Sequence, residues 1–315
     1  MKPDVLVLFP TLEPQMAALS QAYELHRYDL ADAAGRDAML AAVGPRIRAI
    51  VTNGHASLRK DVIDRLPALE VVACSSAGYE TVDVDALTAR GIPLTNTSDA
   101  LFDDVADTAL MLILAARRNL VRAHAWVASG DWGKKGMFPL QSSIRGKRLG
   151  IVGLGRIGRA IADRARSVGL EIAYFSRRER PDSGLVFEPD LVALATWADI
   201  LVVIVAGGPA TRDLVDERVI RALGPDGTLV NVARGSVVDE TALIAALRDG
   251  GLGSAGLDVY RNEPNPDPAL TSLPNVTLHP HHASGTRETR SAMAQLVVDN
   301  LRAHFAGRPL LTRVN

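Results

Sequence analysis

The sequence predicts an α/β protein with two domains, each built around a parallel β-sheet. Short apolar runs alternate with segments of helical periodicity along almost the whole chain, a pattern typical of sheets covered by helices on both faces. The chain has 315 residues, which is enough for two well-filled cores. A glycine-rich turn at residues 153–158 also stands between a predicted strand and a predicted helix, as expected for a βαβ unit.

The N-terminal half contains five predicted strands separated by predicted helices. The strands are residues 5–9, 24–30 (an edge strand), 49–52, 69–75 and 92–95, and the helices are residues 12–23, 35–43, 60–66 and 82–89. A long helix is predicted at residues 99–119, because its acidic start and its two terminal arginines suit the helix dipole. This helix could link two domains. The less regular segment 123–143 indicates a packed connection, or an exposed part that covers a neighbouring subunit.

The glycine turn at residues 153–158 predicts a dinucleotide site. Gly153 permits a tight turn, Gly155 lets the backbone approach a pyrophosphate, and Gly158 lets the helix pack close to the strand. The start of that helix offers N–H groups and the positive end of a dipole to phosphates. The alternative is a tight strand-to-helix turn that binds nothing.

The rest of this half continues the alternation of strands and helices. The strands are residues 149–152, 171–175, 200–205, 228–233, 254–259 and 276–279. The helices are one that ends at Gly169, then residues 188–197, 215–223 and 239–247, and a final helix at residues 287–305 before an extended tail at 309–314. Six strands with intervening helices fit a Rossmann sheet.

Ser176, Arg177 and Arg178 follow the second strand of this sheet, where an NAD-binding chain usually has Asp or Glu. A carboxylate would repel a 2′-phosphate, whereas a hydroxyl and two guanidinium groups can bind one. Two charge-assisted hydrogen bonds of about 1.5–3 kcal/mol each correspond to a preference of tenfold or more. The sequence therefore favours NADP(H), with NAD(H) possible; alternatively, both arginines are solvated loop charges.

Two loops in the N-terminal half follow predicted strands, where open α/β sheets bind ligands. One contains Gly54, and the other contains Ala77, Gly78 and Tyr79. Successive small residues in the second loop could present backbone N–H groups to a carboxylate. Either loop could instead be an ordinary turn.

Arg234, Glu263 and His281 lie just past three predicted strands of the second half, so a single parallel sheet would bring them to one edge. An arginine can bind a carboxylate in a fork and polarise a carbonyl, and a histidine can deliver a proton. A glutamate bonded to that histidine would hold its tautomer. Alternatively, Arg234 caps a strand end, Glu263 is a solvated turn residue and His281 has no catalytic role.

Three histidines lie close together in the sequence, which suggests a metal site as an alternative: His279, His281 and His282. Alternate residues of an extended chain point in opposite directions, and no Cys or carboxylate pattern completes a ligand set, so no metal is expected.

The composition is that of a globular protein, with 47% hydrophobic and 23% charged residues. A net charge of −1 indicates no general attraction to nucleic acid or anionic membranes. The lone cysteine, Cys74, is expected in the core, and no apolar run is long enough to span a bilayer. The first residues show no signal peptide, so a cytoplasmic location is expected.

Four motifs resemble those of the D-2-hydroxyacid dehydrogenase family, in the same order and spacing. They are GLGRIG at 153–158, VNVARGSVVDE at 230–240, GLDVYRNEP at 256–264 and HPHHASGT at 279–286. Within the family, YFSRR at 174–178 and the C-terminal GRPLLTRV are most similar to NADPH-dependent glyoxylate/hydroxypyruvate reductases and to hydroxyphenylpyruvate reductases.

The resemblance implies an NAD(P)-dependent reduction of a small 2-keto acid to the D-2-hydroxy acid, by a homodimer joined through its cofactor domains. A Rossmann cofactor domain (residues 99–285) would be inserted into a smaller flavodoxin-like substrate domain (residues 1–98 and 286–315). The substrate could instead be aromatic, or the chain could be a non-catalytic dinucleotide-sensing protein that binds a protein partner.

The resemblance also assigns roles to individual residues. Arg234 would bind substrate, His281 would donate the proton and Glu263 would be its acidic partner. The loop around Gly78 would hold the substrate carboxylate. The cofactor contacts would be the phosphate loop Leu154, Gly155, Arg156 and Ile157, the 2′-phosphate site Ser176, Arg177 and Arg178, and Val232 and Asp258 beside the nicotinamide.

Overall fold

The computed structural model describes residues 2–315, which divide into two compact units. Unit 1 comprises Met1–Leu101 and Ser284–Asn315, and unit 2 comprises Phe102–Ala283. The sequence placed the two domain boundaries after residues 98 and 285.

Unit 1 has a five-stranded parallel sheet in the order β2-β1-β3-β4-β5. Its strands are β1 (Asp4–Val7), β2 (Glu24–Arg27), β3 (Ile47–Thr52), β4 (Val71–Cys74) and β5 (Leu94–Thr95). Its helices are α1 (Glu13–Ala22), α2 (Ala33–Val43), α3 (Lys60–Asp64), α4 (Val84–Ala89) and α13 (Arg287–Phe305). The strand order changes direction between β1 and β3, so the loops that follow these strands and β4 are where a ligand is expected.

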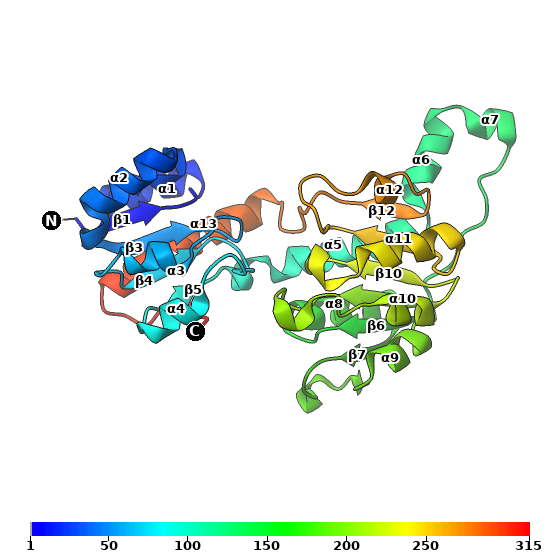
Figure 1. Ribbon diagram of the computed structural model, residues 1–315. Helices are drawn as coiled ribbons and strands as arrows, with labels where there is room; N and C mark the ends of the chain where they lie inside the picture. The colour runs from blue at the N-terminus through cyan, green and yellow to red at the C-terminus, as the bar shows by residue number, and fades with distance from the viewer. Residues whose placement is uncertain (1) are drawn as a thin grey trace. The chain divides into compact units, whose positions relative to one another are not determined.

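The last helix of the chain, α13, completes unit 1 (Figure 1). Alternate residues of each strand face opposite sides of the sheet, so each side has its own core. One side packs against α13 and α1, and the buried residues there are Val5, Leu19, Tyr23, Ala49, Val51, Val71, Ala73, Val297, Val298 and Leu301. The other side packs against the rest of unit 1 through residues such as Leu6, Ile50 and Val72.

Unit 2 has a seven-stranded parallel sheet in the order β12-β11-β10-β9-β6-β7-β8. Its strands are β6 (Arg148–Val152), β7 (Glu171–Phe175), β8 (Val186–Phe187), β9 (Ile200–Val203), β10 (Thr228–Asn231), β11 (Ser254–Leu257) and β12 (Val276–Leu278). Its helices are α6 (Leu120–Ala128), α7 (Asp131–Lys135), α8 (Arg156–Ser167), α9 (Leu191–Trp197), α10 (Glu217–Leu223), α11 (Glu240–Asp249) and α12 (Pro268–Thr271), together with most of α5 (Ser98–Arg117). The order reverses between β6 and β9, which places the glycine turn after β6 at the switch point of a Rossmann sheet.

The structure confirms the predicted fold class, two parallel α/β sheets, and corrects several elements. The second sheet has seven strands rather than six, because Val186 and Phe187 pair with β7. The helix expected from residue 188 begins at Leu191, where the Asp190 carboxylate accepts hydrogen bonds from the N–H groups of Val192 and Ala193. The segment expected to be irregular contains α6 and α7. Within residues 2–315, no helix has the length and apolarity needed to cross a membrane.

Candidate active site

The glycine turn after β6 has the geometry that a dinucleotide requires. Gly153 has φ +108°, a conformation that side chains disfavour, and its N–H donates to the Phe175 carbonyl at 2.8 Å. A Cβ on Gly158 would lie 2.2 Å from the Gly153 carbonyl oxygen, so α8 packs directly on the turn. A Cβ on Gly155 would meet no atom within 4 Å, so the space above this residue is open.

Backbone donors line that open space. Among the described residues, no acceptor is hydrogen-bonded to the N–H groups of Leu154, Gly155 or Ile157. Gly155 caps α8, so these groups are at the positive end of the helix dipole. The turn can therefore bind a diphosphate through its backbone.

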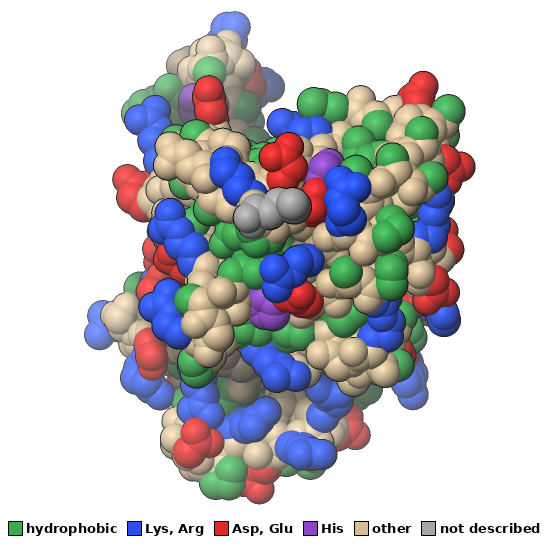
Figure 2. Space-filling model, turned by 90° about the vertical axis from the view of Figure 1, so that its left-hand side faces the viewer, with side chains coloured by type: hydrophobic (Ala, Val, Ile, Leu, Met, Phe, Trp, Pro, Cys, Tyr) green, Lys and Arg blue, Asp and Glu red, His purple; other side chains and the backbone are tan. Residues whose placement is uncertain are grey.

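Ser176, Arg177 and Arg178 follow β7, beside the glycine turn, since Phe175 pairs with Val152 at the ends of β7 and β6. The Ser176 hydroxyl donates to the Arg178 carbonyl at 2.5 Å, and the Arg180 N–H donates to the Tyr174 hydroxyl at 2.7 Å. Both bonds close the loop that presents Arg177 and Arg178, which are exposed and form no ion pair with any of residues 2–315. Figure 2 shows several Lys and Arg side chains close together in the lowest part of the face turned to the viewer, with acidic side chains beside them.

Arg234 follows β10 in a short bend held by the buried side chain of Asn231. The Asn231 amide donates to the Arg234 carbonyl at 3.0 Å, and its oxygen accepts from the Ala233 N–H at 3.0 Å. The Arg234 guanidinium donates to the Ala233 carbonyl at 2.6 Å. The two cofactor-side residues expected here, Val232 and Asp258, are buried.

Glu263 and His281 form a hydrogen-bonded pair, with Glu263 Oε2 2.5 Å from His281 Nδ1. The other oxygen, Oε1, accepts from the Tyr260 N–H at 2.9 Å. Burial raises the pKa of Glu263, but the hydrogen bonds from His281 and Tyr260, and the charges of His281 and Arg234, lower it more. The net pKa therefore lies below the usual value for a glutamate, and the carboxylate is ionised at neutral pH.

The backbone at His281 is held in the left-handed region, with φ 49°. Its N–H donates to the Asp258 carbonyl at 2.7 Å, and the Asp258 carboxylate accepts from the N–H groups of His282 and Ala283 at 2.8 and 3.2 Å. Asp258 Oδ1 also lies 2.5 Å from His279 Nδ1. A carboxylate has about four acceptor positions, so these three contacts leave one acceptor position of the buried Asp258 unused.

Two residues of the histidine cluster bind different carboxylates: His279 pairs with Asp258, and His281 pairs with Glu263. Within residues 2–315, no three side chains of His, Cys, Asp or Glu are grouped so that they could hold a metal ion.

The two loops expected to bind substrate lie together in unit 1. A Cβ on Gly54 would lie 2.7 Å from the Gly78 carbonyl oxygen, and the Thr81 hydroxyl donates to the Gly54 carbonyl at 3.2 Å. In the described part of the chain, the N–H groups of Ser76, Ala77, Gly78 and Tyr79 have no hydrogen-bond acceptor. Four successive unsatisfied donors are suited to bind an anion.

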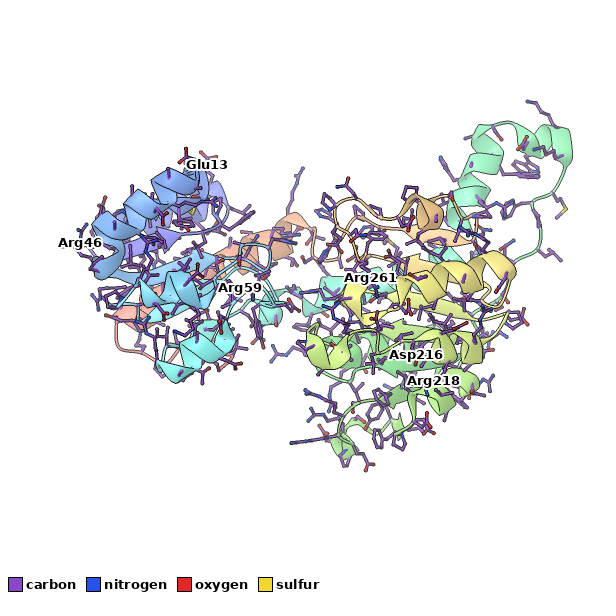
Figure 3. All side chains as sticks on the ribbon, in the orientation of Figure 1. Glu13, Arg46, Arg59, Asp216, Arg218 and Arg261 are labelled. Atoms are coloured by element: carbon purple, nitrogen blue, oxygen red, sulfur yellow. The ribbon has the colours of Figure 1, made fainter. Side chains whose placement is uncertain are left out.

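The sequence missed the residues that hold Arg234 and Glu263 in register. A Cβ on Gly235 would lie 1.9 Å from the Tyr260 carbonyl carbon, so the two backbones are in direct contact. Glu240 Oε2 accepts from the Arg261 N–H at 3.0 Å, and the Arg261 side chain (labelled in Figure 3) is paired with Asp213. The buried polar residue Asn231 at the end of β10 was the signal that could have been noticed.

The family described as "D-isomer specific 2-hydroxyacid dehydrogenase, NAD binding domain" matches residues 110–283. The 2-ketogluconate reductase of Gluconobacter oxydans (strain 621H) is 44% identical over 313 residues, 99% of each chain. The hydroxyphenylpyruvate reductase of Plectranthus scutellarioides is 45% identical over 310 residues, 98% of each chain.

A similar solved structure is that of an NADPH-dependent glyoxylate/hydroxypyruvate reductase from Sinorhizobium meliloti in complex with NADP and malonate. It is 42% identical, has a TM-score of 0.90, and the match covers 100% of this chain and 97% of that one. These similarities extend across both units and confirm the resemblance seen in the sequence motifs. The chain therefore belongs to the D-isomer specific 2-hydroxyacid dehydrogenase family.

Proposed function

We propose that this protein uses NADPH to reduce a 2-keto acid to the corresponding D-2-hydroxy acid. The observation that carries the proposal is the group formed by Arg234, Glu263 and His281 after parallel strands of unit 2. The histidine and the glutamate are 2.5 Å apart, and the charge of Arg234 acts on the same glutamate.

The cofactor diphosphate would bind to the phosphate loop formed by Leu154, Gly155, Arg156 and Ile157. The open space over Gly155 and the unsatisfied N–H groups of this turn support that position. Val232 and the remaining acceptor position of Asp258 would contact the nicotinamide side. When bound, the cofactor supplies the hydride.

Arg234 would bind the keto acid, because a guanidinium presents two parallel donors to a carboxylate and polarises a neighbouring carbonyl. The Asn231 bonds fix the bend from which it projects. His281 would donate a proton from Nε2 to the carbonyl oxygen, while Nδ1 remains bonded to Glu263. The Glu263 carboxylate accepts from Nδ1 and so fixes the ring with Nε2 available to the substrate.

Loop 75–79 would hold the substrate carboxylate through the N–H groups of Ala77, Gly78 and Tyr79, with Gly54 packed against it. This role is supported by the unsatisfied state of these donors. A backbone site of this kind recognises a carboxylate and leaves the rest of the substrate free to vary.

The preference for NADPH is supported by the residues after β7. Arg177 and Arg178 are exposed, form no ion pair within residues 2–315, and project from a closed loop beside the glycine turn. No carboxylate follows Phe175 directly to repel a 2′-phosphate. A similar structure is described as NADPH-dependent and contains NADP.

The substrate is proposed to be a small 2-keto acid of the glyoxylate or hydroxypyruvate type. The relatives of this chain include reductases named for glyoxylate and hydroxypyruvate, for 2-ketogluconate and for hydroxyphenylpyruvate. The hydroxyphenylpyruvate reductase is 45% identical to this chain, so an aromatic 2-keto acid is the second candidate substrate.

The test is the initial rate of NADPH and NADH oxidation with glyoxylate, hydroxypyruvate, pyruvate, 2-ketogluconate, phenylpyruvate and hydroxyphenylpyruvate. We expect turnover of one or two of the small acids with NADPH and slow turnover with NADH. His281→Gln should lower kcat by about 10²–10⁴-fold, the usual effect of removing a general acid. Absence of turnover with every keto acid, from protein that binds NADPH, would contradict the proposal and favour a sensing role.

A double variant tests the proposed preference for NADPH. Arg177→Ala with Arg178→Ala should reduce kcat/KM for NADPH by about 10–100-fold and leave kcat/KM for NADH unchanged, since one or two charge-assisted bonds are lost. Arg308→Ala, which removes an exposed arginine of unit 1, is the matched control. Equal loss with both cofactors would contradict the 2′-phosphate site.

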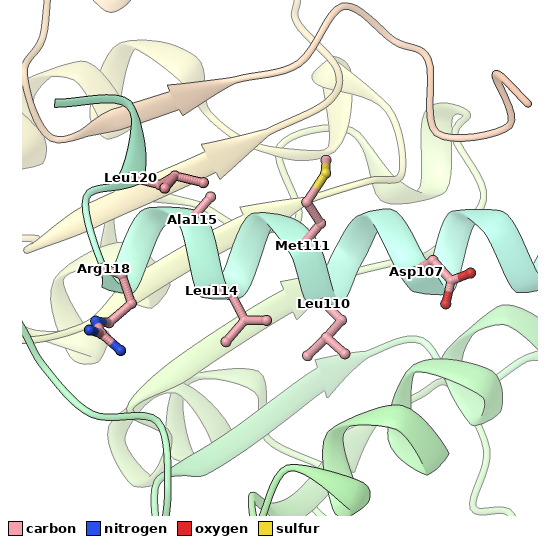
Figure 4. A pocket seen from close by; sticks show the side chains of 7 residues that line it. All are labelled: Asp107, Leu110, Met111, Leu114, Ala115, Arg118 and Leu120. Carbon is pink, nitrogen blue, oxygen red and sulfur yellow. The ribbon is translucent and has the colours of Figure 1, made fainter. Parts of the chain in front are cut away.

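We also propose that the chain forms a homodimer through unit 2. A groove of about 590 Å³ on α5 is lined mainly by apolar side chains, among them the exposed Met111 and Leu114, and also by Asp107 and Arg118 (Figure 4). The adjoining helices α6 and α7 have no buried residue. Exposed apolar residues along this segment are Leu120, Val121, Val127, Trp132, Met137 and Leu140. A second copy related by a two-fold axis would cover this surface on both chains.

The cytoplasmic location expected from the sequence stays a prediction, which fractionation of the source cells would test.

A further inference from the structure

Asn96 and Thr97, directly after β5 of unit 1, hold two consecutive carbonyl groups of loop 75–79. The Asn96 side-chain amide donates to the Ala77 carbonyl at 3.1 Å and to the Ser98 hydroxyl at 2.7 Å. The Thr97 N–H donates to the Ser76 carbonyl at 3.0 Å. Both donor positions of the Asn96 amide are therefore used.

These two bonds fix the direction of the loop's N–H groups. In a trans peptide, the C=O and the N–H point in opposite directions from the same plane. The carbonyls of Ser76 and Ala77 face residues 96–97, so the N–H groups of Ala77 and Gly78 face away from them. These are two of the four N–H groups that have no acceptor within residues 2–315.

The C-terminal tail holds Asn96 in turn. The Thr312 hydroxyl donates to the Asn96 carbonyl at 2.6 Å, and the Asn96 N–H donates to the Thr312 carbonyl at 3.2 Å. The Thr312 hydroxyl also accepts from the side-chain amide of Asn300 at 3.0 Å. Asn300 lies on α13, is 1% exposed, and accepts from the Leu311 N–H at 3.0 Å.

We propose that Asn96 is a positioning residue for recognition of the substrate carboxylate, and that Thr312 keeps it in place from the C-terminal tail. This rests on the proposed function, in which loop 75–79 binds that carboxylate. Asn96 acts by turning the Ala77–Gly78 peptide so that its N–H faces the anion. Without this bond the peptide is free to rotate, and the donors are no longer aligned before substrate binds.

A purely structural role for the same hydrogen bonds makes a different prediction. Loss of fold lowers the activity toward every substrate alike. Loss of a carboxylate contact raises KM for a keto acid and spares its neutral ester, so the ratio of kcat/KM for pyruvate to that for methyl pyruvate separates the two.

The experiment compares the parent with Asn96→Ala, Thr312→Val and Thr312→Ser in the full-length protein. Thr312→Val keeps the shape of the side chain but removes the hydroxyl, and Thr312→Ser restores the hydroxyl. We expect Asn96→Ala to raise KM for pyruvate about tenfold and to lower the acid-to-ester ratio about tenfold, with kcat changed less than about threefold. Thr312→Val should shift KM in the same direction by about threefold, and Thr312→Ser should match the parent. The Kd for NADPH should not change, because the proposed cofactor residues belong to unit 2.

Three results would overturn the proposal. Unchanged KM in both Asn96→Ala and Thr312→Val refutes it while the proposed function stands. An equal loss toward acid and ester in Thr312→Val, which tests the idea even if Asn96→Ala folds poorly, shows a structural role alone. No turnover of any 2-keto acid by the parent refutes the proposed function and this inference with it.

Discussion

Glutamine in place of Glu263 tests the proposed proton transfer, because it keeps the shape of the side chain and removes its charge. In the structure, Glu263 accepts from the Tyr260 N–H at 2.9 Å and lies 2.5 Å from His281 Nδ1. Its pKa is lowered despite burial, so in the parent the carboxylate stays ionised to a pH below the usual glutamate value. The parent should therefore reduce the keto acid at a constant rate across mildly acidic pH.

The size of the effect follows from this one contact. A hydrogen bond to a charged group contributes about 1.5–3 kcal/mol, and about 1.4 kcal/mol corresponds to a tenfold change in rate. The two side chains are 31% and 27% exposed, so solvent screening favours the lower end of that range. Reduction requires a proton from His281, and the Glu263 carboxylate accepts the hydrogen bond that orients the imidazole ring. We expect Glu263→Gln to lower kcat at neutral pH about tenfold, and to remove the loss of activity that follows protonation of the parent's carboxylate at acidic pH.

The assay is the pH profile of kcat and kcat/KM between pH 4 and 10 at saturating NADPH, for the parent, Glu263→Gln and Glu263→Asp. The aspartate variant keeps the charge at a longer distance and should lie between the other two. A Glu263→Gln profile that coincides with the parent's in position and height would refute a role for Glu263 in proton transfer.

Four further predictions test other parts of the structure. Gly158→Ala places a Cβ 2.2 Å from the Gly153 carbonyl oxygen and should lower Tm by about 2–10 °C. The Cβ of Gly155→Ala meets no atom within 4 Å, so this variant should weaken NADPH binding at an unchanged Tm. Melting curves measure Tm, and a fluorescence titration measures NADPH binding. Gly235→Ala forces the Tyr260 backbone away by steric overlap, so kcat should fall at least tenfold in steady-state assays, and normal kcat would contradict the contact. Burial raises the pKa of Asp199, but hydrogen bonds from Arg148 and the charge of Lys147 lower it more. The ionised carboxylate therefore stabilises the folded protein above about pH 4, and this stabilisation is lost as pH falls through the lowered pKa. Asp199→Asn should lower Tm by a few degrees at pH 7 and by less at pH 3. Leu114→Glu should convert the dimer to monomer in light scattering, while Leu30→Glu, at an exposed leucine of unit 1, should not, and a monomeric parent would refute the dimer.

Both sheets were predictable from the sequence because their strands are short, apolar and buried, and are separated by helices with clear periodicity. Strand β8 was missed, since its two residues, Val186 and Phe187, show no pattern of their own, whereas the equally short β5 was predicted as part of the longer run 92–95. Glycines at 130, 133 and 136 obscured the helices α6 and α7, which are short and contain no buried residue.

The chemistry of the site was predictable as far as it depends on strand ends. Arg234, Glu263 and His281 follow strands of one parallel sheet, so topology alone brings them to one edge. Sequence could not show which carboxylate pairs with which histidine, because that depends on the backbone of segment 279–282, where His279 pairs with Asp258 and His281, in the left-handed region, pairs with Glu263. The bond from Thr312 to Asn96 was equally hidden, since 216 residues separate its partners.

The return of α13 to unit 1 sets an order of events during synthesis. Strand β5 ends at Thr95 and α13 ends at Phe305, so all five strands of unit 1 leave the ribosome long before the helix that covers one of their faces. At about 5–20 residues per second, the interval is roughly 10–40 s. Only near the end of that time does unit 2 have its complete sequence available, while Val51, Val71 and Ala73 still lack their packing partners on α13. The growing chain therefore carries a partly uncovered apolar sheet face for most of its synthesis, and this face is where a chaperone would bind and where aggregation would begin.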